Sequence, residues 1–287
     1  MGVLVDYLAL YPIKVLHDLV GAILYSNNWK IPMDKGKRMI GKISIAYPLF
    51  ESPHIIMMWL GLYEYSLIFL MKKYLRKGDT FLDVGANIGY FSAYALSIVG
   101  EKGQVFAFEP DPRSYSYLLM LKTSNPKYNI SIERIALSNR TGKAVINQTK
   151  DWGTTTLVRE IREESNIAQK LVVKSIRLDN YLNKKNIKQI KLIKIDVEGF
   201  EMQVLQGLSS FLTKTNSRPV IMVEVYPYAM EKTGMSLGVL DAWLKRYKYS
   251  TLGNIEVLRL LKGSSDMYNL VLLPDWMARN NNISSQH

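Results

Sequence analysis

Three short apolar segments of this chain each end in glycine or acidic residues. They read TFLDVGANIG at residues 80–89, VFAFEPD at residues 105–111 and LIKIDVEGFE at residues 192–201. Apolar segments of this length alternate with helical segments between residues 80 and 246, which predicts a mostly parallel sheet covered by helices on both faces. In such sheets, ligands bind at the carboxyl ends of the strands. We therefore expect one site where the three segments end.

The first segment runs from a strand through a glycine turn into a helix. Gly85 and Gly89 let the backbone approach a ligand closely, and the N–H groups of the following helix face that ligand. The spacing differs from the G-x-G-x-x-G of dinucleotide folds. Asp83 would repel a pyrophosphate but attract an amino group and tolerate a sulfonium, and S-adenosylmethionine carries both. The alternative is that Asp83 only ends the strand and caps the turn.

The second and third segments add carboxylates. Glu109 ends its strand more than twenty residues after the glycine turn, where nucleotide-binding folds place the acid that binds ribose hydroxyls; a solvent-exposed strand end is the alternative. Asp196 and Glu198 follow the third strand, where they can accept hydrogen bonds, act as a base or bind a hard cation. Glu201 fits the simpler role of an acid favoured by a helix N-terminus.

Composition excludes several classes of protein. The chain has no cysteine and only three scattered histidines, so we expect no disulfide, no thiolate catalysis and no cysteine or histidine metal site. A net charge of +12 favours anionic partners, but no nucleic-acid-binding motif accompanies it, and we do not expect nucleic acid to bind.

The N-terminal region has two apolar stretches. Residues 1–29 predict an amphipathic helix without the features of a signal peptide, which suggests a cytoplasmic protein; peripheral membrane contact through residues 1–30 is the alternative. Residues 55–75 predict a second helix. Glu64 lies in its middle and is costly in lipid, so a buried packing helix is favoured over a membrane span.

Together the segments resemble the FkbM family of S-adenosylmethionine-dependent methyltransferases. The resemblance covers about residues 63–274 and rests on Tyr63-Glu64, DVGANIGYFS, FEPDP, ALSNRTG, GTTTL and IDVEGFE. It implies a class I, Rossmann-like sheet of seven mostly parallel strands with an antiparallel final hairpin. We expect a helical extension at residues 1–74, the cofactor-binding domain at residues 75–275 and a flexible tail at residues 276–287.

The resemblance also implies roles for individual residues. Asp196 and Glu198 would face the methyl-transfer point, with His54 and Glu224 as weaker candidates for the base. The residues expected to hold S-adenosylmethionine are Asp83, Gly85, Ala86, Asn87, Gly89, Tyr90, Glu109, Pro110, Ala136, Leu137 and Ser138. A divalent metal on Asp196, Glu198 and Glu224 is conceivable but not predicted.

The expected reaction is O-methylation of a hydroxyl on a sugar, a glycan or a lipid-linked glycan. Trp152, in the loop at residues 151–157, either stacks on a sugar ring or anchors the loop. We expect most of the lysines between residues 184 and 194 to be exposed; clustered at the strand ends, they would favour an anionic acceptor. The alternatives are a nicotinamide-dependent oxidoreductase and a non-catalytic module that binds membrane surfaces.

Overall fold

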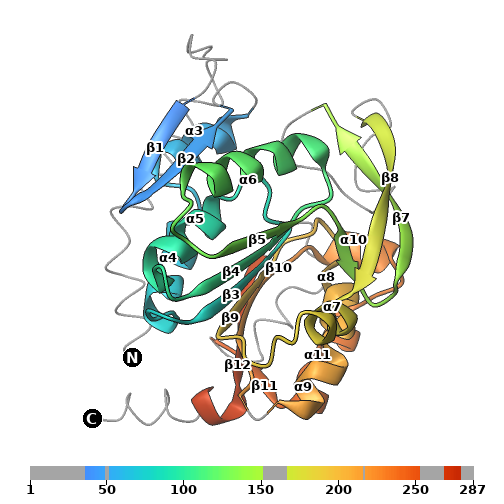
Figure 1. Ribbon diagram of the computed structural model, residues 1–287. Coiled ribbons are helices and arrows are strands. Elements are labelled where there is room, and N and C mark those ends of the chain that lie inside the picture. The colour runs from blue at the N-terminus through green and yellow to red at the C-terminus, as the bar shows by residue number, and fades with distance from the viewer. Residues whose placement is uncertain (1–35, 49–51, 151–166, 216, 253–267, 279–287) are drawn as a thin grey trace.

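The computed structural model describes residues 36–48, 52–150, 167–215, 217–252 and 268–278, and shows a mixed α/β fold built on a central sheet (Figure 1). Seven strands in these residues form that sheet. From one edge to the other they are β11 (Tyr249–Thr251), β12 (Tyr268–Pro274), β10 (Val220–Val225), β9 (Leu192–Ile195), β3 (Thr80–Val84), β4 (Gln104–Phe108) and β5 (Ile130–Glu133).

The strand directions agree with the predicted sheet. The ladders that join β10, β9, β3, β4 and β5 are all parallel, whereas β12 is antiparallel to both β10 and β11. The antiparallel final strand was therefore expected correctly. The apolar pattern predicts the hairpin partner of this strand at residues 255–261, which lie outside the described residues; among the described strands, β12 pairs with β10 and β11.

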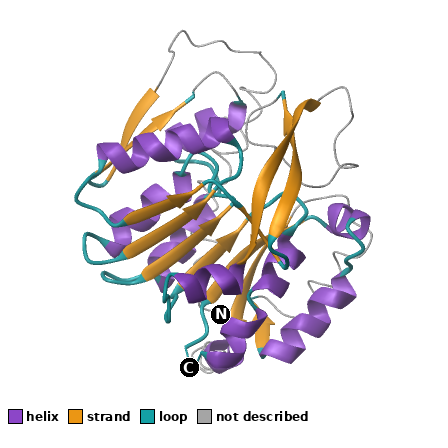
Figure 2. Ribbon diagram, turned by 45° about the vertical axis from the view of Figure 1, so that its right-hand side comes forward, coloured by secondary structure: helices purple, strands orange, loops and turns teal. Residues whose placement is uncertain are grey.

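Helices cover both faces of the sheet, because successive side chains of each strand point to opposite sides (Figure 2). On one face Phe81 and Leu192 pack with helices α3 to α6, and on the other Leu82 and Ile193 pack with helices α7 to α11. The first group is α3 (Pro53–Leu60), α4 (Tyr65–Tyr74), α5 (Tyr90–Val99) and α6 (Pro112–Ser124). The second is α7 (Leu178–Lys184), α8 (Glu201–Gly207), α9 (Ser209–Lys214), α10 (Pro227–Lys232) and α11 (Leu237–Tyr247).

The N-terminal extension is not purely helical. An antiparallel hairpin of β1 (Gly36–Ile40) and β2 (Ile43–Tyr47) precedes α3. It is fixed to the end of α6, since the Asn125 amide donates to the Ser44 carbonyl oxygen at 2.7 Å and accepts from the Ser44 N–H at 2.9 Å. The hairpin, α3 and α4 share one core with α5 and α6. The predicted helix at residues 1–29 lies outside the described residues, and the boundary at residue 74 stays a prediction.

The prediction of a single helix at residues 55–75 was wrong. The chain forms two helices there, α3 and α4, with a bend of 49° between them. Gly61 ends α3 in a left-handed conformation, with φ of 76°. Arg38 of the hairpin donates to the carbonyl oxygens of Met58 and Trp59, so a partner distant in sequence caps this end. Among the described residues no single helix is long and apolar enough to cross a membrane. The bent pair of α3 and α4, taken together, is long and apolar enough by length and composition alone.

A smaller sheet lies beside the central one and contains the strands β6 (Ala136–Ser138), β8 (Ile167–Arg177) and β7 (Gly142–Thr149) (Figure 2). The apolar pattern of the sequence predicts strands at residues 143–147 and 171–176, and β7 and β8 confirm both. The apolar pattern also predicts a single strand at residues 130–137, and this prediction was wrong. It divides after Glu133, because β5 pairs with β4 in the central sheet whereas β6 pairs with β8.

Candidate active site

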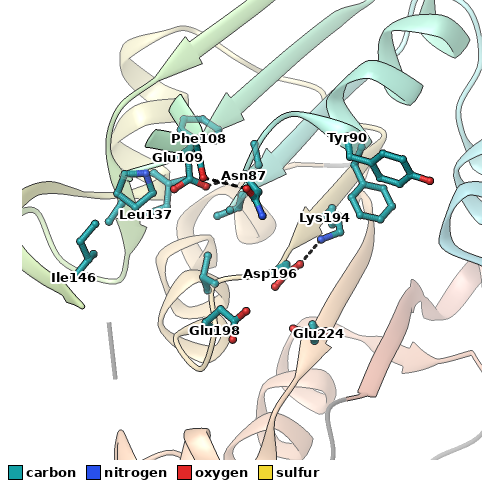
Figure 3. A pocket seen from close by; sticks show the side chains of 18 of the residues that line it. Asn87, Tyr90, Phe108, Glu109, Leu137, Ile146, Lys194, Asp196, Glu198 and Glu224 are labelled. Carbon is teal, nitrogen blue, oxygen red and sulfur yellow. Dashed lines mark hydrogen bonds and ion pairs between the residues drawn. The ribbon is translucent and has the colours of Figure 1, made fainter. Parts of the chain in front are cut away.

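A cavity of ≈ 260 Å³ lies at the carboxyl ends of β3, β4, β9 and β10 (Figure 3). This volume is close to the lower limit of about 300 Å³ for typical ligand pockets. Most of the residues expected to form the site line the cavity, and these are Gly85, Ala86, Asn87, Tyr90, Glu109, Pro110, Ala136, Leu137, Asp196 and Glu198.

The register of the parallel strands brings these residues together. Val84 on β3 lies opposite Phe108 on β4 and opposite Ile195 on β9. The next residue of each strand is therefore at the same edge of the sheet: the N–H of Gly85 donates to the Phe108 carbonyl at 3.0 Å, and the N–H of Asp196 donates to the Val84 carbonyl at 2.9 Å. Three segments that are far apart in sequence thus end side by side.

Glu109 is held rigidly at one end of the cavity. Its Oε2 accepts the N–H of Asn87 and its Oε1 accepts the N–H of Asp111, both at 2.8 Å. The side chain is only 7% exposed, and burial raises its pKa to about 8 although the two backbone N–H groups oppose the shift. Each carboxylate oxygen has a further lone pair, so the group can accept two hydroxyls from a ligand in the cavity.

The walls next to Glu109 are apolar. The cavity is lined there by Phe108, Ile135, Leu137 and Ile146. Of these four, the sequence predicted only Leu137 as a site residue. Such walls suit a flat heterocycle. Ser138 was expected here but does not line the cavity; its hydroxyl donates to the Asn139 side chain at 3.3 Å instead.

The other end of the cavity is acidic. Asp196, Glu198 and Glu224 each offer a carboxylate oxygen, and these oxygens lie within 4.8 Å of one another. We call these three residues the acidic cluster. Repulsion from Asp196, followed by burial, raises the pKa of Glu224 to about 11, so Glu224 is neutral at pH 7. Oxygen ligands at this spacing would also suit a hard divalent cation, which the sequence had left open.

Glu198 projects from a distorted turn at the end of β9. Its φ of 54° is rare for a residue with a side chain, and Gly199 follows with φ of 101°. Glu201 stabilises the turn, since its Oε1 accepts the N–H of Gly199 at 2.8 Å and that of Val197 at 3.2 Å. Glu201 thus has a local structural role, which agrees with the simpler interpretation of the sequence. Glu198, by contrast, lines the cavity.

Lys194 is buried, whereas most of the lysines between residues 184 and 194 are exposed, as expected. It is 3% exposed, its Nζ lies 2.7 Å from Asp196 Oδ2, and the ammonium lies 4.4 Å from the centre of the Phe91 ring. Burial lowers the pKa of Lys194, but the carboxylates of Asp196, Glu64 and Asp83 raise it further than that, so the side chain is an ammonium. Lys184, Lys185 and Lys188 are exposed as expected.

Asp83 and Gly89 are the other two predicted residues that do not line the cavity. Asp83 is 1% exposed and accepts the Ser92 hydroxyl at 2.6 Å. It lies opposite Lys194 in the strand register and contributes to the raised pKa of that lysine. Gly89 begins α5 with φ of 89°, and a Cβ there would lie 2.8 Å from a Leu118 methyl group. Its contribution is close packing of α6 on α5.

The N-terminal extension closes one wall of the cavity through His54, Met58 and Tyr63. The Tyr63 carbonyl accepts the Tyr90 hydroxyl at 3.1 Å, and the Tyr63 ring packs edge-to-face on His54 and on Tyr90 at 5.9 Å each. Sequence reasoning noted His54 and Tyr63 but missed Met58, because no motif marks an apolar helix residue as part of a site. Trp152 and its loop lie outside the described residues.

Replacing Gly85 with alanine should destabilise the protein more than replacing Gly78 does. Both glycines have φ near 80–90°, but a Cβ on Gly85 would overlap the Asp196 carbonyl oxygen, whereas nothing lies within 4 Å of one on Gly78. Gly78→Ala should cost about 1–2 kcal/mol for its backbone conformation, and Gly85→Ala about 1–3 kcal/mol more for the overlap. Urea unfolding of both variants measures this; equal losses would contradict the close contact.

Comparison with protein families identifies one match over more than half of the chain: the Methyltransferase FkbM domain matches residues 83–251. A hexuronic acid methyltransferase, AglP of Haloferax volcanii, is 27% identical over 163 residues, which are 57% of this chain and 62% of that protein. The 2-O-methyltransferase NoeI of Sinorhizobium fredii is 29% identical over 154 residues, 49% of this chain and 62% of that protein. The chain thus spans about three fifths of the length of these relatives.

Two solved structures align with part of this chain at low sequence identity. The FkbM methyltransferase of Methylobacillus flagellatus KT has a TM-score of 0.45 and 15% identity, covering 72% of this chain and 47% of that one. Fibrillarin of Aeropyrum pernix, solved with bound S-adenosyl-L-methionine, has a TM-score of 0.41 and 11% identity, covering 73% of this chain and 74% of that one.

Proposed function

The chain belongs to the FkbM methyltransferase family, and we propose that it transfers a methyl group from S-adenosylmethionine to a hydroxyl oxygen of a sugar or glycan. One observation carries the proposal: a single cavity has a fixed acceptor for two hydroxyls, Glu109, at one end and the acidic cluster at the other. The two relatives named for a hexuronic acid and for 2-O-methylation support a sugar oxygen as the acceptor. The strand order supports the class I methyltransferase sheet.

The chemistry of the cavity fits this cofactor. Glu109 can accept both ribose hydroxyls, and the apolar walls formed by Phe108, Ile135 and Leu137 suit adenine. The glycine turn at Gly85 lets the backbone lie close to the methionine part. The acidic cluster favours the positive sulfonium, whereas a pyrophosphate at the same place would be repelled. This last point argues against the nicotinamide-dependent alternative.

S-adenosylmethionine supplies a methyl group on a sulfonium, which makes its thioether a good leaving group. The residues of the chain then have two tasks. They align the acceptor hydroxyl with the methyl carbon, which can contribute on the order of 7–11 kcal/mol, and they accept the proton that the hydroxyl loses. A carbon–oxygen bond forms, the carbon–sulfur bond breaks with its electron pair kept by sulfur, and the proton passes to a carboxylate of the acidic cluster.

Glu198 is the member of the acidic cluster that we assign as this base. Asp196 is ion-paired with Lys194 at 2.7 Å, and the pKa of Glu224 lies at about 11, so Glu224 already holds a proton at pH 7. Glu198 also has the unusual backbone conformation, which costs about 1–3 kcal/mol and is typical of functional positions. Asp196 and Lys194 would fix the geometry around it.

Isothermal titration of the purified protein with S-adenosylhomocysteine, and separately with NAD, tests the proposal. Binding of the first and not the second supports it, and the reverse result would favour an oxidoreductase. Incubation with methyl-labelled S-adenosylmethionine and a cell extract, followed by identification of the labelled product, then shows whether the product is a sugar methyl ether. Absence of binding to either ligand would favour the non-catalytic alternative.

Binding of S-adenosylhomocysteine should become tighter as the pH rises. The pKa of Glu109 is raised to about 8, so the ionised form that accepts two hydroxyls is the minority below pH 8 and the majority above it. If only this form binds, the apparent Kd should fall about tenfold between pH 7 and pH 9. Titration calorimetry across this range measures the change. The Glu109→Gln variant is the control, since its profile reports only the titration of the ligand itself.

A further inference from the structure

The strand β7 brings two buried side chains to the end of the cavity where Glu109 lies. Ile146 lines the cavity beside Leu137, on the same side as Glu109 (Figure 3). Gln148 follows two residues later, so it lies on the same face of the strand; Gln148 is 3% exposed and Ile146 is 1% exposed. Because β7 belongs to the smaller sheet, a strand outside the central sheet reaches this end of the cavity.

A chain of hydrogen bonds leads from Gln148 to Glu109. The side-chain N–H of Gln148 donates to Asp111 Oδ1 at 2.7 Å, and the backbone N–H of Asp111 donates to Glu109 Oε1 at 2.8 Å. Gln148 is itself fixed from the other side, because the Gln169 amide donates to its side-chain oxygen at 2.6 Å. A buried network whose members satisfy one another is rigid. The smaller sheet therefore holds Asp111 in one place.

Asp111 joins β7 to the segment that carries Glu109. It is the N-cap of α6, where its Oδ1 also accepts the N–H of Arg113 at 2.8 Å. The Arg113 guanidinium pairs with Asp111 Oδ2 at 3.2 Å and donates to the Thr149 carbonyl of β7 at 3.0 Å. Prolines flank Asp111 on both sides and have a fixed φ. This segment thus has little freedom of its own, and its position depends on β7.

The Glu109 carboxyl needs this support because it has to present both oxygens to the ribose at once. The N–H of Asn87 fixes Oε2 and the N–H of Asp111 fixes Oε1, so a displaced Asp111 would release one oxygen and let the carboxyl rotate. Binding groups keep a productive geometry when surrounding hydrogen bonds lock their rotamers. Gln148 does not line the cavity, so an effect of Gln148 on the cofactor passes through Asp111.

We propose that Gln148 is a positioning residue for cofactor binding: it holds Asp111, which orients the Glu109 carboxyl toward the ribose hydroxyls. The smaller sheet thereby takes part in binding the cofactor. The inference rests on the proposed function, because it takes Glu109 as the group that binds the ribose. Sequence reasoning missed Gln148, since no local motif marks a glutamine of an edge strand as part of a site.

A double-mutant cycle in the affinity for S-adenosylhomocysteine tests the inference. NMR titrations at pH 9, where most of the Glu109 carboxyl is ionised, measure the Kd values of four proteins. Gln148→Met keeps the length of the side chain but removes the donor to Asp111, and should raise the Kd of the otherwise unchanged protein about three- to tenfold. In the Glu109→Ala background the same substitution should change the Kd by less than about twofold, because the carboxyl through which Gln148 acts is gone.

A purely structural role of Gln148 gives a different result. It would weaken binding by the same factor with and without Glu109, and that outcome, or an unchanged Kd for Gln148→Met, would overturn the inference. Gln148→Asn is a second variant, which keeps the amide but shortens its reach to Asp111, and should raise the Kd likewise. Thermal melts confirm that each variant is folded.

Gln169→Met is the matched control. It removes an amide of the same kind from β8 but leaves the bond from Gln148 to Asp111 in place, so the Kd should stay within about twofold of the unchanged protein. A loss as large as that of Gln148→Met would show that the smaller sheet acts only through its stability, which would also overturn the inference. If the unchanged protein does not bind S-adenosylhomocysteine, the proposed function itself fails; binding without coupling between Gln148 and Glu109 contradicts this inference alone.

Discussion

Replacing Glu198 with glutamine should lower kcat by about 10²–10⁴-fold, the contribution typical of a general base. The Kd for S-adenosylhomocysteine should stay within about twofold, since the lost interaction is made only while the hydroxyl gives up its proton. Glutamine has the shape of glutamate but cannot accept this proton. Initial rates with labelled cofactor and the identified acceptor, together with calorimetric binding, measure both quantities on the same protein.

Glu224→Gln is the matched control for this prediction. This substitution also replaces a glutamate of the acidic cluster with glutamine, so it matches Glu198→Gln in size and shape. The pKa of Glu224 is about 11, however, so glutamine replaces a side chain that is already neutral at pH 7. Its kcat should fall by less than about tenfold. If Glu224→Gln abolishes turnover and Glu198→Gln does not, the base is Glu224, and the pH profile of kcat should then rise toward pH 11.

At pH 9, where most of this carboxyl group is ionised, replacing Glu109 with alanine should raise the Kd for S-adenosylhomocysteine by about 10²-fold, because two hydrogen bonds to a buried carboxylate are lost. The effect on kcat at saturating cofactor should be small, since Glu109 lies at the opposite end of the cavity from the acidic cluster (Figure 3). Calorimetry gives the first quantity and initial rates give the second. Glu109 also accepts the N–H groups of Asn87 and Asp111, so a melt must confirm that the variant is folded.

Glu133 provides the comparison for Glu109. It ends the neighbouring strand β5 directly opposite Phe108, but its Oε1 accepts the Tyr181 hydroxyl at 3.0 Å and pairs with Lys185 at 3.2 Å. It does not line the cavity. Glu133→Ala should leave the Kd for S-adenosylhomocysteine unchanged. If both alanine variants bind equally well, Glu109 does not hold the ribose and the cofactor lies elsewhere.

The position of the site was predictable from local patterns. Apolar strands that end in glycine or acids identified Gly85, Glu109 and Asp196, and the parallel sheet requires that such ends meet at one edge. The alternation of strands and helices likewise predicted the central sheet and its antiparallel last strand. Strand ends and the alternation of strands and helices depend on residues that are close together in the sequence, so a local pattern is enough to predict them.

The side chains that set the charge of the site were not predictable in the same way. The sequence placed Asp83 in the site and did not identify Lys194 as a buried lysine, whereas the strand register sets the two opposite each other in the interior. Likewise, the end of α3 at the bend is capped by Arg38, about twenty residues away in the sequence. Local sequence determined which strands carry functional groups and where these strands end. Only the tertiary structure decided which charges neutralise one another, because burial and pairing depend on neighbours that the fold brings together from distant parts of the chain.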